Sequence, residues 1–108
     1  MRIELNRGLK LTEVLRKYHP DFPPNGLAIF FAVALDEGLS AGDVVERLEI
    51  PKATVSRNLR ALGDRVSPQK EGMNLIRMEH DAADYRIRRA YLTERGRAFK
   101  EEVILALG

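Results

Sequence analysis

The stretch from Ser40 to Leu62 constrains the fold more than any other part of the chain, because it reads as two short helices separated by a tight break. Ser40 can cap the first helix, since Asp43 follows at the spacing of a capping box. The break lies at Glu49–Ile50, and the fixed φ of Pro51 suits the first turn of a new helix. The stretch therefore predicts a helix-turn-helix unit.

The second helix of this unit has two contrasting faces. Val55, Leu59 and Leu62 recur at i, i+4 and i+7, so their side of the helix is expected in the core. The opposite side and its flanks are small, hydroxylated or cationic and carry no acid; they comprise Ala53, Thr54, Ser56, Arg57, Arg60 and Ala61. Such a surface can enter a DNA major groove and read base edges beside phosphates. The alternative is a pair of amphipathic helices that only packs into a core.

Length and composition set the class of protein. A chain of 108 residues can bury one modest core, so we expect a single domain over residues 1–108. There is no cysteine, which excludes disulfides and cysteine-ligated metal centres and makes a reducing cytoplasm the natural compartment. No apolar run is long enough to span a bilayer, and the start of the chain does not resemble a signal peptide. No membrane partner is expected.

The charges are distributed unevenly although the net charge is only +2. Residues 1–50 carry 6 basic and 8 acidic side chains, a net of −2, whereas residues 51–108 carry 12 basic and 8 acidic side chains, a net of +4. The sign changes where the second helix of the unit begins. This distribution favours a basic surface directed at phosphate.

The N-terminal half is expected to supply helices that support this unit. Residues 1–7 are interpreted as irregular or as a short strand, and apolar spacing predicts a helix over Leu9–Tyr18 that stops before His19–Pro20. The run Leu27–Leu35 is apolar almost all round, so it should form the buried central helix, with Gly38 as a left-handed cap beyond it. Val44 and Leu48 should join this core from the first helix of the unit.

After Leu62 the pattern changes, and from Asn74 the apolar period shifts toward two. Ser67–Gly72 reads as a loop, Leu75–His80 as a strand, Asp81–Asp84 as a turn and Tyr85–Leu92 as a returning strand. A basic hairpin directly after a recognition helix indicates the wing of a winged helix. Thr93 then caps a last helix over residues 94–107. The predicted fold class is α+β, mostly α: a winged helix-turn-helix with a two-stranded β wing.

The last helix carries an apolar stripe of Phe99, Val103, Ile104 and Leu107. This stripe exceeds what one small core needs, and the helix over Leu9–Tyr18 can pair with it. We therefore expect the terminal helices, about 9–18 and 94–107, to form a two-fold homodimer. The alternative is that the stripe packs onto its own domain.

Two motifs in this order resemble the MarR-type winged-helix transcriptional regulators. Thr54-Val55-Ser56-Arg57-x-Leu59-x-x-Leu62 is similar to the family's recognition helix, and Asp84-x-Arg86 followed by Leu92-Thr93-Glu94-Arg95-Gly96 is similar to its wing. The resemblance covers roughly residues 27–100. It implies that Arg86 lies at the wing tip and enters the minor groove, with Asp84 orienting it. The terminal helices are shorter than usual for the family, and no pocket for a small inducer can be identified, so an effector is left unassigned.

The candidate DNA-binding residues follow from charge and position. Arg57 and Arg60 can read guanine or bind phosphate through a bidentate fork, although the alternative is that they are solvated helix arginines. The remaining candidates are Ala53, which is small enough for close approach, Lys52, Thr54 and Ser56 as phosphate contacts, and Arg86 with Arg88 on one side of the wing. Strand alternation places Arg89 on the other side.

Other functional classes are less well supported by the sequence. His19 and His80 belong to no triad or acid–base spacing, and there is no nucleotide-binding loop, so no enzyme and no cofactor are expected. The acids and the histidine of residues 79–84 are a weak candidate for metal, and no metal site is assigned. The leading hypothesis is a sequence-specific, double-stranded-DNA-binding transcriptional regulator. The alternatives are a winged-helix accessory protein of replication, partition or recombination, and a winged helix that binds protein.

Overall fold

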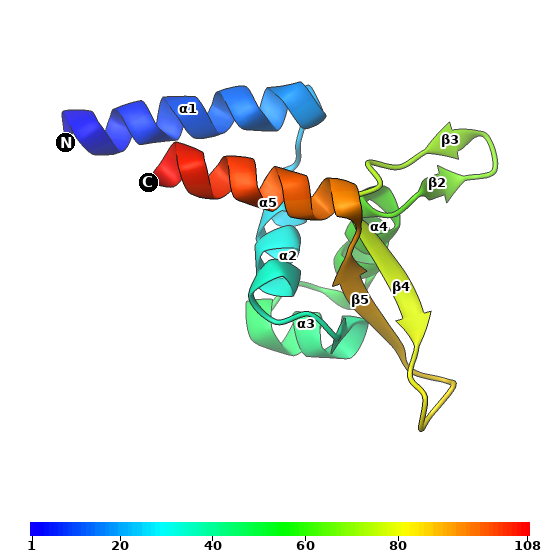
Figure 1. The fold of residues 1–108 in the computed structure, drawn as a ribbon. Helices are drawn as coiled ribbons and strands as arrows, with labels where there is room; N and C mark the ends of the chain where they lie inside the picture. The colour runs from blue at the N-terminus through cyan, green and yellow to red at the C-terminus, as the bar shows by residue number, and fades with distance from the viewer.

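The helices of the protein form two groups in the computed structural model, which describes residues 1–108. The central group consists of α2 (Pro24–Leu35), α3 (Ala41–Leu48) and α4 (Lys52–Leu62). The terminal helices α1 (Arg2–Tyr18) and α5 (Glu94–Leu107) lie side by side along one edge of this group, with both chain ends at the same end of the molecule (Figure 1). No helix is both long enough and apolar enough to cross a membrane.

Two antiparallel sheets accompany the helices. The larger sheet has the order β1-β5-β4, formed by β1 (Leu39–Ser40), β5 (Arg88–Leu92) and β4 (Ile76–His80). Strands β4 and β5 pair from Ile76 opposite Leu92 to His80 opposite Arg88, and their hairpin projects away from the helices as the wing (Figure 1). A second hairpin pairs β2 (Arg65–Ser67) with β3 (Lys70–Glu71). The structure therefore confirms the predicted winged helix-turn-helix.

A single cluster of 16 buried residues joins the central helices, the larger sheet and α5. The predicted core residues Val44, Val55, Leu59 and Leu62 are buried, and Leu48 packs against the cluster at its edge. Within the predicted run Leu27–Leu35, the side chains of Ile29, Phe30, Ala32 and Val33 are buried. The expectation was wrong for Leu35, which is 81% exposed, because it ends α2 where the chain turns away from the core.

The predicted caps of the helix-turn-helix unit are present. Ser40 accepts a hydrogen bond from the amide of Asp43 at 3.2 Å, and the Asp43 carboxylate accepts one from the amide of Ser40 at 3.0 Å, which completes the capping box. Glu49 ends α3 in the left-handed region with φ 55°, and Pro51, predicted in the first turn of α4, is instead the N-cap residue directly before Lys52. These local signals explain why both helix boundaries were predictable.

The N-terminal boundary was wrong, because α1 begins at Arg2 rather than near Leu9. Ile3, Leu5 and Leu9 fall at odd positions, which resembles the alternation of a strand, but in the structure they are exposed on the helix. The terminal ammonium pairs with Glu4 at 2.6 Å in the first turn. An acid is favourable there because it opposes the positive end of the helix dipole.

Two predictions between α4 and α5 also need correction. Ser67–Gly72, expected to be a loop, contributes to the second hairpin, since Ser67 pairs with Lys70 across a tight turn. The returning strand of the wing begins at Arg88 rather than at Tyr85, because residues 81–87 form a longer tip closed by side-chain hydrogen bonds. The wing is therefore shorter in its strands and longer in its tip than predicted.

Candidate nucleic-acid interface

The outer face of α4 carries cations that have no acidic partner. Lys52, Arg57 and Arg60 are exposed, and none of them forms an ion pair within 4.0 Å. Ala53 is exposed beside them, while Thr54 and Ser56 are half-buried on the flanks, as the helical wheel predicted. The opposite face is held in the core by Val55, Leu59 and Leu62. The helix is thus fixed by packing while its cations keep their hydrogen-bond donors available.

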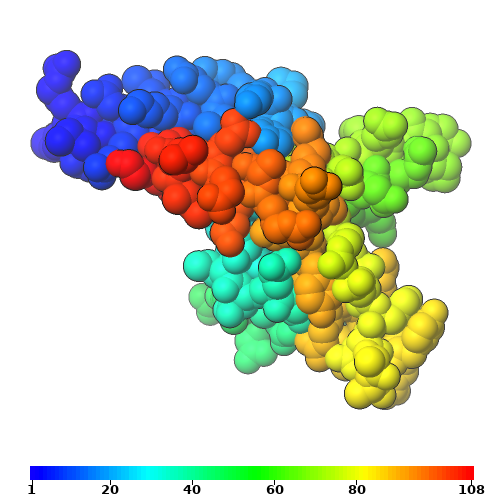
Figure 2. All heavy atoms as spheres, viewed as in Figure 1, coloured from blue at the N-terminus to red at the C-terminus, as the bar shows by residue number.

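A single groove of about 1390 Å³ connects α4 with both hairpins. Its lining holds seven cationic side chains and only two acids; the cations are Lys52, Arg60, Arg65, Arg77, Arg86, Arg88 and Arg89, and the acids are Asp43 and Asp64. The space-filling view shows the two hairpins as separate lobes with a hollow between them (Figure 2). This concentration of positive charge within a concave surface suits a polyanion.

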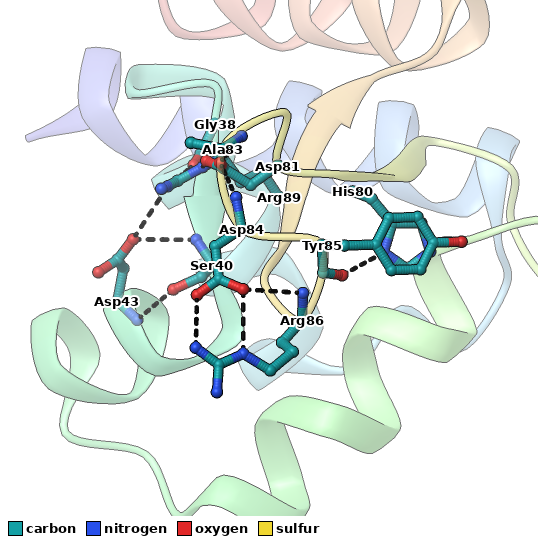
Figure 3. Close-up of polar contacts among 10 residues, drawn as sticks. All are labelled: Gly38, Ser40, Asp43, His80, Asp81, Ala83, Asp84, Tyr85, Arg86 and Arg89. Atoms are coloured by element: carbon teal, nitrogen blue, oxygen red, sulfur yellow. Dashed lines mark hydrogen bonds and ion pairs between the residues drawn. The ribbon is translucent and has the colours of Figure 1, made fainter.

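The tip of the wing is organised around Arg86 and Asp84. The Nε and Nη2 atoms of Arg86 each donate to the Asp84 carboxylate at 3.1 Å, and the Arg86 amide donates to the same carboxylate at 3.1 Å (Figure 3). These hydrogen bonds lower the pKa of Asp84 and raise that of Arg86. The Arg86 side chain remains 90% exposed. The acid therefore holds the arginine in one orientation at the tip without burying it.

A second acid, Asp81, closes the base of the tip. Its carboxylate accepts hydrogen bonds from the amides of Ala83 and Asp84 at 2.7 and 2.9 Å and from Nε of Arg89 at 2.6 Å. The bond from Arg89 and the two amides lower the pKa of Asp81 to about 2. The carboxylate is therefore ionised at any ordinary pH.

Arg89 ties the wing to the start of α3. Its Nη1 donates to the carbonyl of Gly38 at 2.9 Å and lies 4.0 Å from the carboxylate of Asp43, which completes the capping box of α3 with Ser40 (Figure 3). Gly38 takes φ 102°, which favours glycine, and brings its carbonyl to the wing. Arg88 alternates to the other side of the strand and is exposed without an ion pair, as predicted.

An aromatic pair completes the tip. The rings of His80 and Tyr85 stack at 3.9 Å with an interplanar angle of 10°, and Nδ1 of His80 lies 2.8 Å from the carbonyl of Tyr85 (Figure 3). Because a carbonyl only accepts, this contact places a proton on Nδ1. The histidine and the acids of residues 79–84 thus have partners within the wing itself, among them Glu79 with Arg77 at 2.7 Å.

The structure brings most predicted DNA-binding residues into the groove but not all of them. Lys52, Ser56 and Arg60 line it from α4, and Arg86 and Arg88 line it from the wing. The other three, Ala53, Thr54 and Arg57, lie on α4 outside the groove lining. Sequence reasoning missed Arg65 and Arg77, which also line the groove. The basic character of the second half of the chain was the only signal that could have drawn attention to them.

The terminal helices are joined within the chain by a polar and aromatic contact. The Tyr18 hydroxyl donates to Glu102, to which Lys17 also pairs at 2.7 Å, and the guanidinium of Arg95 lies 4.7 Å from the Tyr18 ring centroid. Partial burial together with the bond to Glu102 raises the pKa of Tyr18 to about 12, and its partners lower the pKa of Glu102. This contact accounts for the antiparallel packing of α1 on α5.

The packing of α1 on α5 buries part of the apolar stripe proposed for dimerisation and leaves the rest exposed. Phe99 and Val103 are 0% and 4% exposed within the chain's own core, so the expectation that they contact a second copy needs correction. Phe99 stacks on Phe22 and also contacts Tyr18. Ile104 and Leu107 remain about half exposed. Further apolar side chains at this end of the molecule are exposed with them: Ile3, Leu5, Leu9 and Leu105.

Known structures share this arrangement. The chain is similar to MepR of S. aureus in a DNA complex (TM-score 0.75, 23% identity, covering 92% of this chain and 73% of that one). It is also similar to the transcriptional regulator Tm0710 of Thermotoga maritima, with a TM-score of 0.74 and 19% identity over 97% of this chain and 64% of that one. The YusO protein of Bacillus subtilis is similar with a TM-score of 0.70 and 22% identity over 93% of this chain and 64% of that one. The chain spans about 64% of the length of the latter two.

Comparison at the level of sequence gives no further relationship. No protein-family profile matches the chain, and no curated protein matches it. The MarR-type resemblance expected from the two motifs is confirmed at the level of the fold, since the similar structures include one described as a MarR transcriptional regulator from Methanosarcina mazei. The chain has the winged helix-turn-helix fold of the MarR-type regulators.

Proposed function

We propose that the protein is a sequence-specific, double-stranded-DNA-binding transcriptional regulator. The observation that carries this proposal is the groove in which the acid-free cationic face of α4 meets the wing. The similarity to MepR in its DNA complex supports the same conclusion. A regulator of this kind acts by binding rather than by catalysis, and it acts in the cytoplasm, where the DNA is.

In this proposal α4 enters the major groove. Arg57 and Arg60 project from its exposed face and can each offer a bidentate fork to a guanine or bind a phosphate. Ala53 lets the helix approach the base edges closely, and the hydroxyl groups of Thr54 and Ser56 lie where they can contact phosphate oxygens. Lys52, in the first turn, supplies charge without a fork and is expected to bind phosphate.

The wing is proposed to contact the adjacent minor groove. Arg86, held by Asp84, presents an exposed guanidinium at the tip, and a narrow minor groove attracts such a group through its enhanced negative potential. Arg88 also lines the groove, is exposed, and can bind the flanking backbone. Arg89 stays with Asp81 and Gly38 and is expected to position the wing rather than to contact DNA.

The active unit is proposed to be a homodimer of one domain per chain. The buried core runs from Ile29 to Val103 with partly buried residues of α1 packed against it, and the exposed apolar side chains of α1 and α5 lie together at one end of the molecule. A two-fold contact through Ile104, Leu107 and the first half of α1 would place two recognition helices roughly one DNA turn apart, about 34 Å. One copy alone would bury only about 600–1,000 Å² on DNA, which favours two.

The test is selection of binding sites from a random double-stranded DNA library, followed by mobility-shift titrations at several salt concentrations. Wild-type protein should enrich a two-fold symmetric motif, and Arg60→Ala should lose affinity for it. Arg16→Ala is the matched control, because Arg16 is an exposed arginine without an ion pair on α1. Failure to enrich any motif, or equal losses for both variants, would contradict the proposal.

A further inference from the structure

The second hairpin, formed by β2 and β3 over Arg65–Glu71, has no part in the helix-turn-helix unit or in the wing. It projects from the same side of the molecule as the wing and bounds the other side of the hollow (Figures 1 and 2). Arg65, Val66, Ser67 and Pro68 line the groove from this side, opposite the residues of the wing. A ligand that fills the groove would therefore meet three elements rather than two.

The hairpin is held rigidly against the end of α4. The Gly72 amide donates to the carbonyl of Asp64 at 2.8 Å, and the next three amides, of Met73, Asn74 and Leu75, donate at 2.8 Å to carbonyls of the last turn of α4 and Gly63. A Cβ on Gly72 would lie 2.2 Å from the carbonyl oxygen of Gly63, so only glycine allows this approach. The position of the hairpin is consequently fixed by the position of α4.

Arg65 is the cation that the hairpin contributes to the groove. Its side chain donates only one long hydrogen bond, from Nη1 to the carbonyl of Pro68 at 3.4 Å. Glu71 lies opposite Arg65 in the strand pairing, but no ion pair joins them within 4.0 Å. Most of the N–H donors of its guanidinium are therefore available to an anion, as are those of Arg60 near the end of α4.

We propose that the second hairpin is a third DNA contact, in which Arg65 binds a backbone phosphate on the side of the groove opposite the wing. This inference rests on the proposed DNA-binding function and adds a contact outside the helix and the wing. A phosphate contact fixes the register of the protein on the duplex but carries no sequence information. The hairpin thus strengthens binding to all DNA sequences and lengthens the protected site.

The experiment compares Arg65→Ala with Lys70→Ala in salt titrations of DNA binding. Lys70 is exposed on the same hairpin but does not line the groove, so it is a control matched in charge and in place. Arg65→Ala should lower the slope of log affinity against log salt by about 0.9, equally for selected and scrambled DNA. Arg65→Lys should retain the slope, and Lys70→Ala should leave it unchanged.

Two outcomes would overturn the proposal while leaving the DNA-binding function intact. One is that Arg65→Ala binds with the wild-type slope although Arg60→Ala loses affinity. The other is that Lys70→Ala lowers the slope as much as Arg65→Ala, which would indicate only a general effect of net charge. If wild-type protein binds no DNA, the proposed function itself fails. Hydroxyl-radical footprints should agree, with protection at the affected phosphates lost in Arg65→Ala alone.

Discussion

The cations of α4 differ from most of those on the wing in their partners. On the wing, Arg77, Arg86 and Arg89 each form an ion pair with an acid of the same hairpin, and Arg88 alone forms none. On α4, neither Lys52 nor the two arginines has an acidic partner. The difference follows from packing, because α4 is fixed through a buried face whereas the wing tip extends beyond the core. On the wing, ion pairs with acids hold the arginine side chains in place, because the core does not reach them.

The largest effect should come from removing the packing that positions α4. Leu62 is fully buried, so Leu62→Ala should lower the free energy of unfolding by about 2–5 kcal/mol through lost burial and a residual cavity. Urea unfolding followed by circular dichroism measures this change. Arg57→Ala, on the exposed face of the same helix, should stay within about 0.5 kcal/mol of wild type. Comparable losses would show that the cations also stabilise the helix.

The next effect concerns what the unpaired cations of α4 recognise. Arg57→Ala should weaken binding to the selected DNA by about 1–3 kcal/mol if the arginine reads a base, and should relax the preference at one position. Lys52→Ala should weaken binding evenly across sequences and lower the salt slope by about 0.9. Binding-site selection with each variant measures the base preference, and salt titrations of binding measure the affinity and the salt slope. An unchanged motif and affinity for Arg57→Ala would place this arginine outside the interface.

A smaller and more selective effect is expected when the acid that holds Arg86 is removed. Asp84→Asn leaves the cation in place but removes its bidentate partner and one negative charge from the tip. Affinity for scrambled DNA should therefore be equal or higher, while the preference for sites with a narrow flanking minor groove should fall. Arg86→Ala should lower both the affinity for scrambled DNA and the preference for sites with a narrow flanking minor groove. If Asp84→Asn keeps the full preference, orientation by the acid is unnecessary.

The smallest effect is the acid sensitivity of the wing. The pKa of Asp81 is lowered from 3.8 to about 2, so the folded protein favours the ionised form. The resulting stabilisation is complete above pH 3.8 and is lost as the pH falls toward 2. NMR titration of the Ala83 and Asp84 amides, which donate to this carboxylate, should show a transition in that window. Asp81→Asn should abolish the transition, and a midpoint near 3.8 would refute the contact.

The parts of the fold that were predictable from the sequence are those set by local signals. The capping box at Ser40, the break before Pro51 and the two faces of α4 each depend on residues within one or two turns. The second hairpin was missed because its strands are two or three residues long and mostly polar, and they are held by amides bonded to α4. The sequence of the hairpin contains no pattern from which those hydrogen bonds to α4 could be predicted.

The residues of the candidate site likewise include some that the sequence predicts and others whose roles depend on distant parts of the chain. Arg86 and Arg88, assigned to one side of the wing by alternation, both line the groove, but Arg89, assigned to the other side, lines it too, and Arg86 lies in the tip before β5 begins. The role of Arg89 depends on Gly38, which is distant in the sequence, so it could not be derived. The stripe of α5 was overestimated as a contact surface because Phe99 meets aromatic rings from α1 and from the segment before α2. Such contacts are a property of the tertiary fold.

The bond between Asp64 and Gly72 has a practical consequence for engineering. It closes the base of the second hairpin, so the chain leaves α4 and returns to it at almost the same point. Residues 65–71 can therefore be shortened, extended or exchanged without moving α4 or β4, since lengthening a closed surface loop costs little extra entropy. A peptide tag or a fluorophore grafted there would be carried at a fixed place beside the groove. The molecule thus contains a natural insertion point.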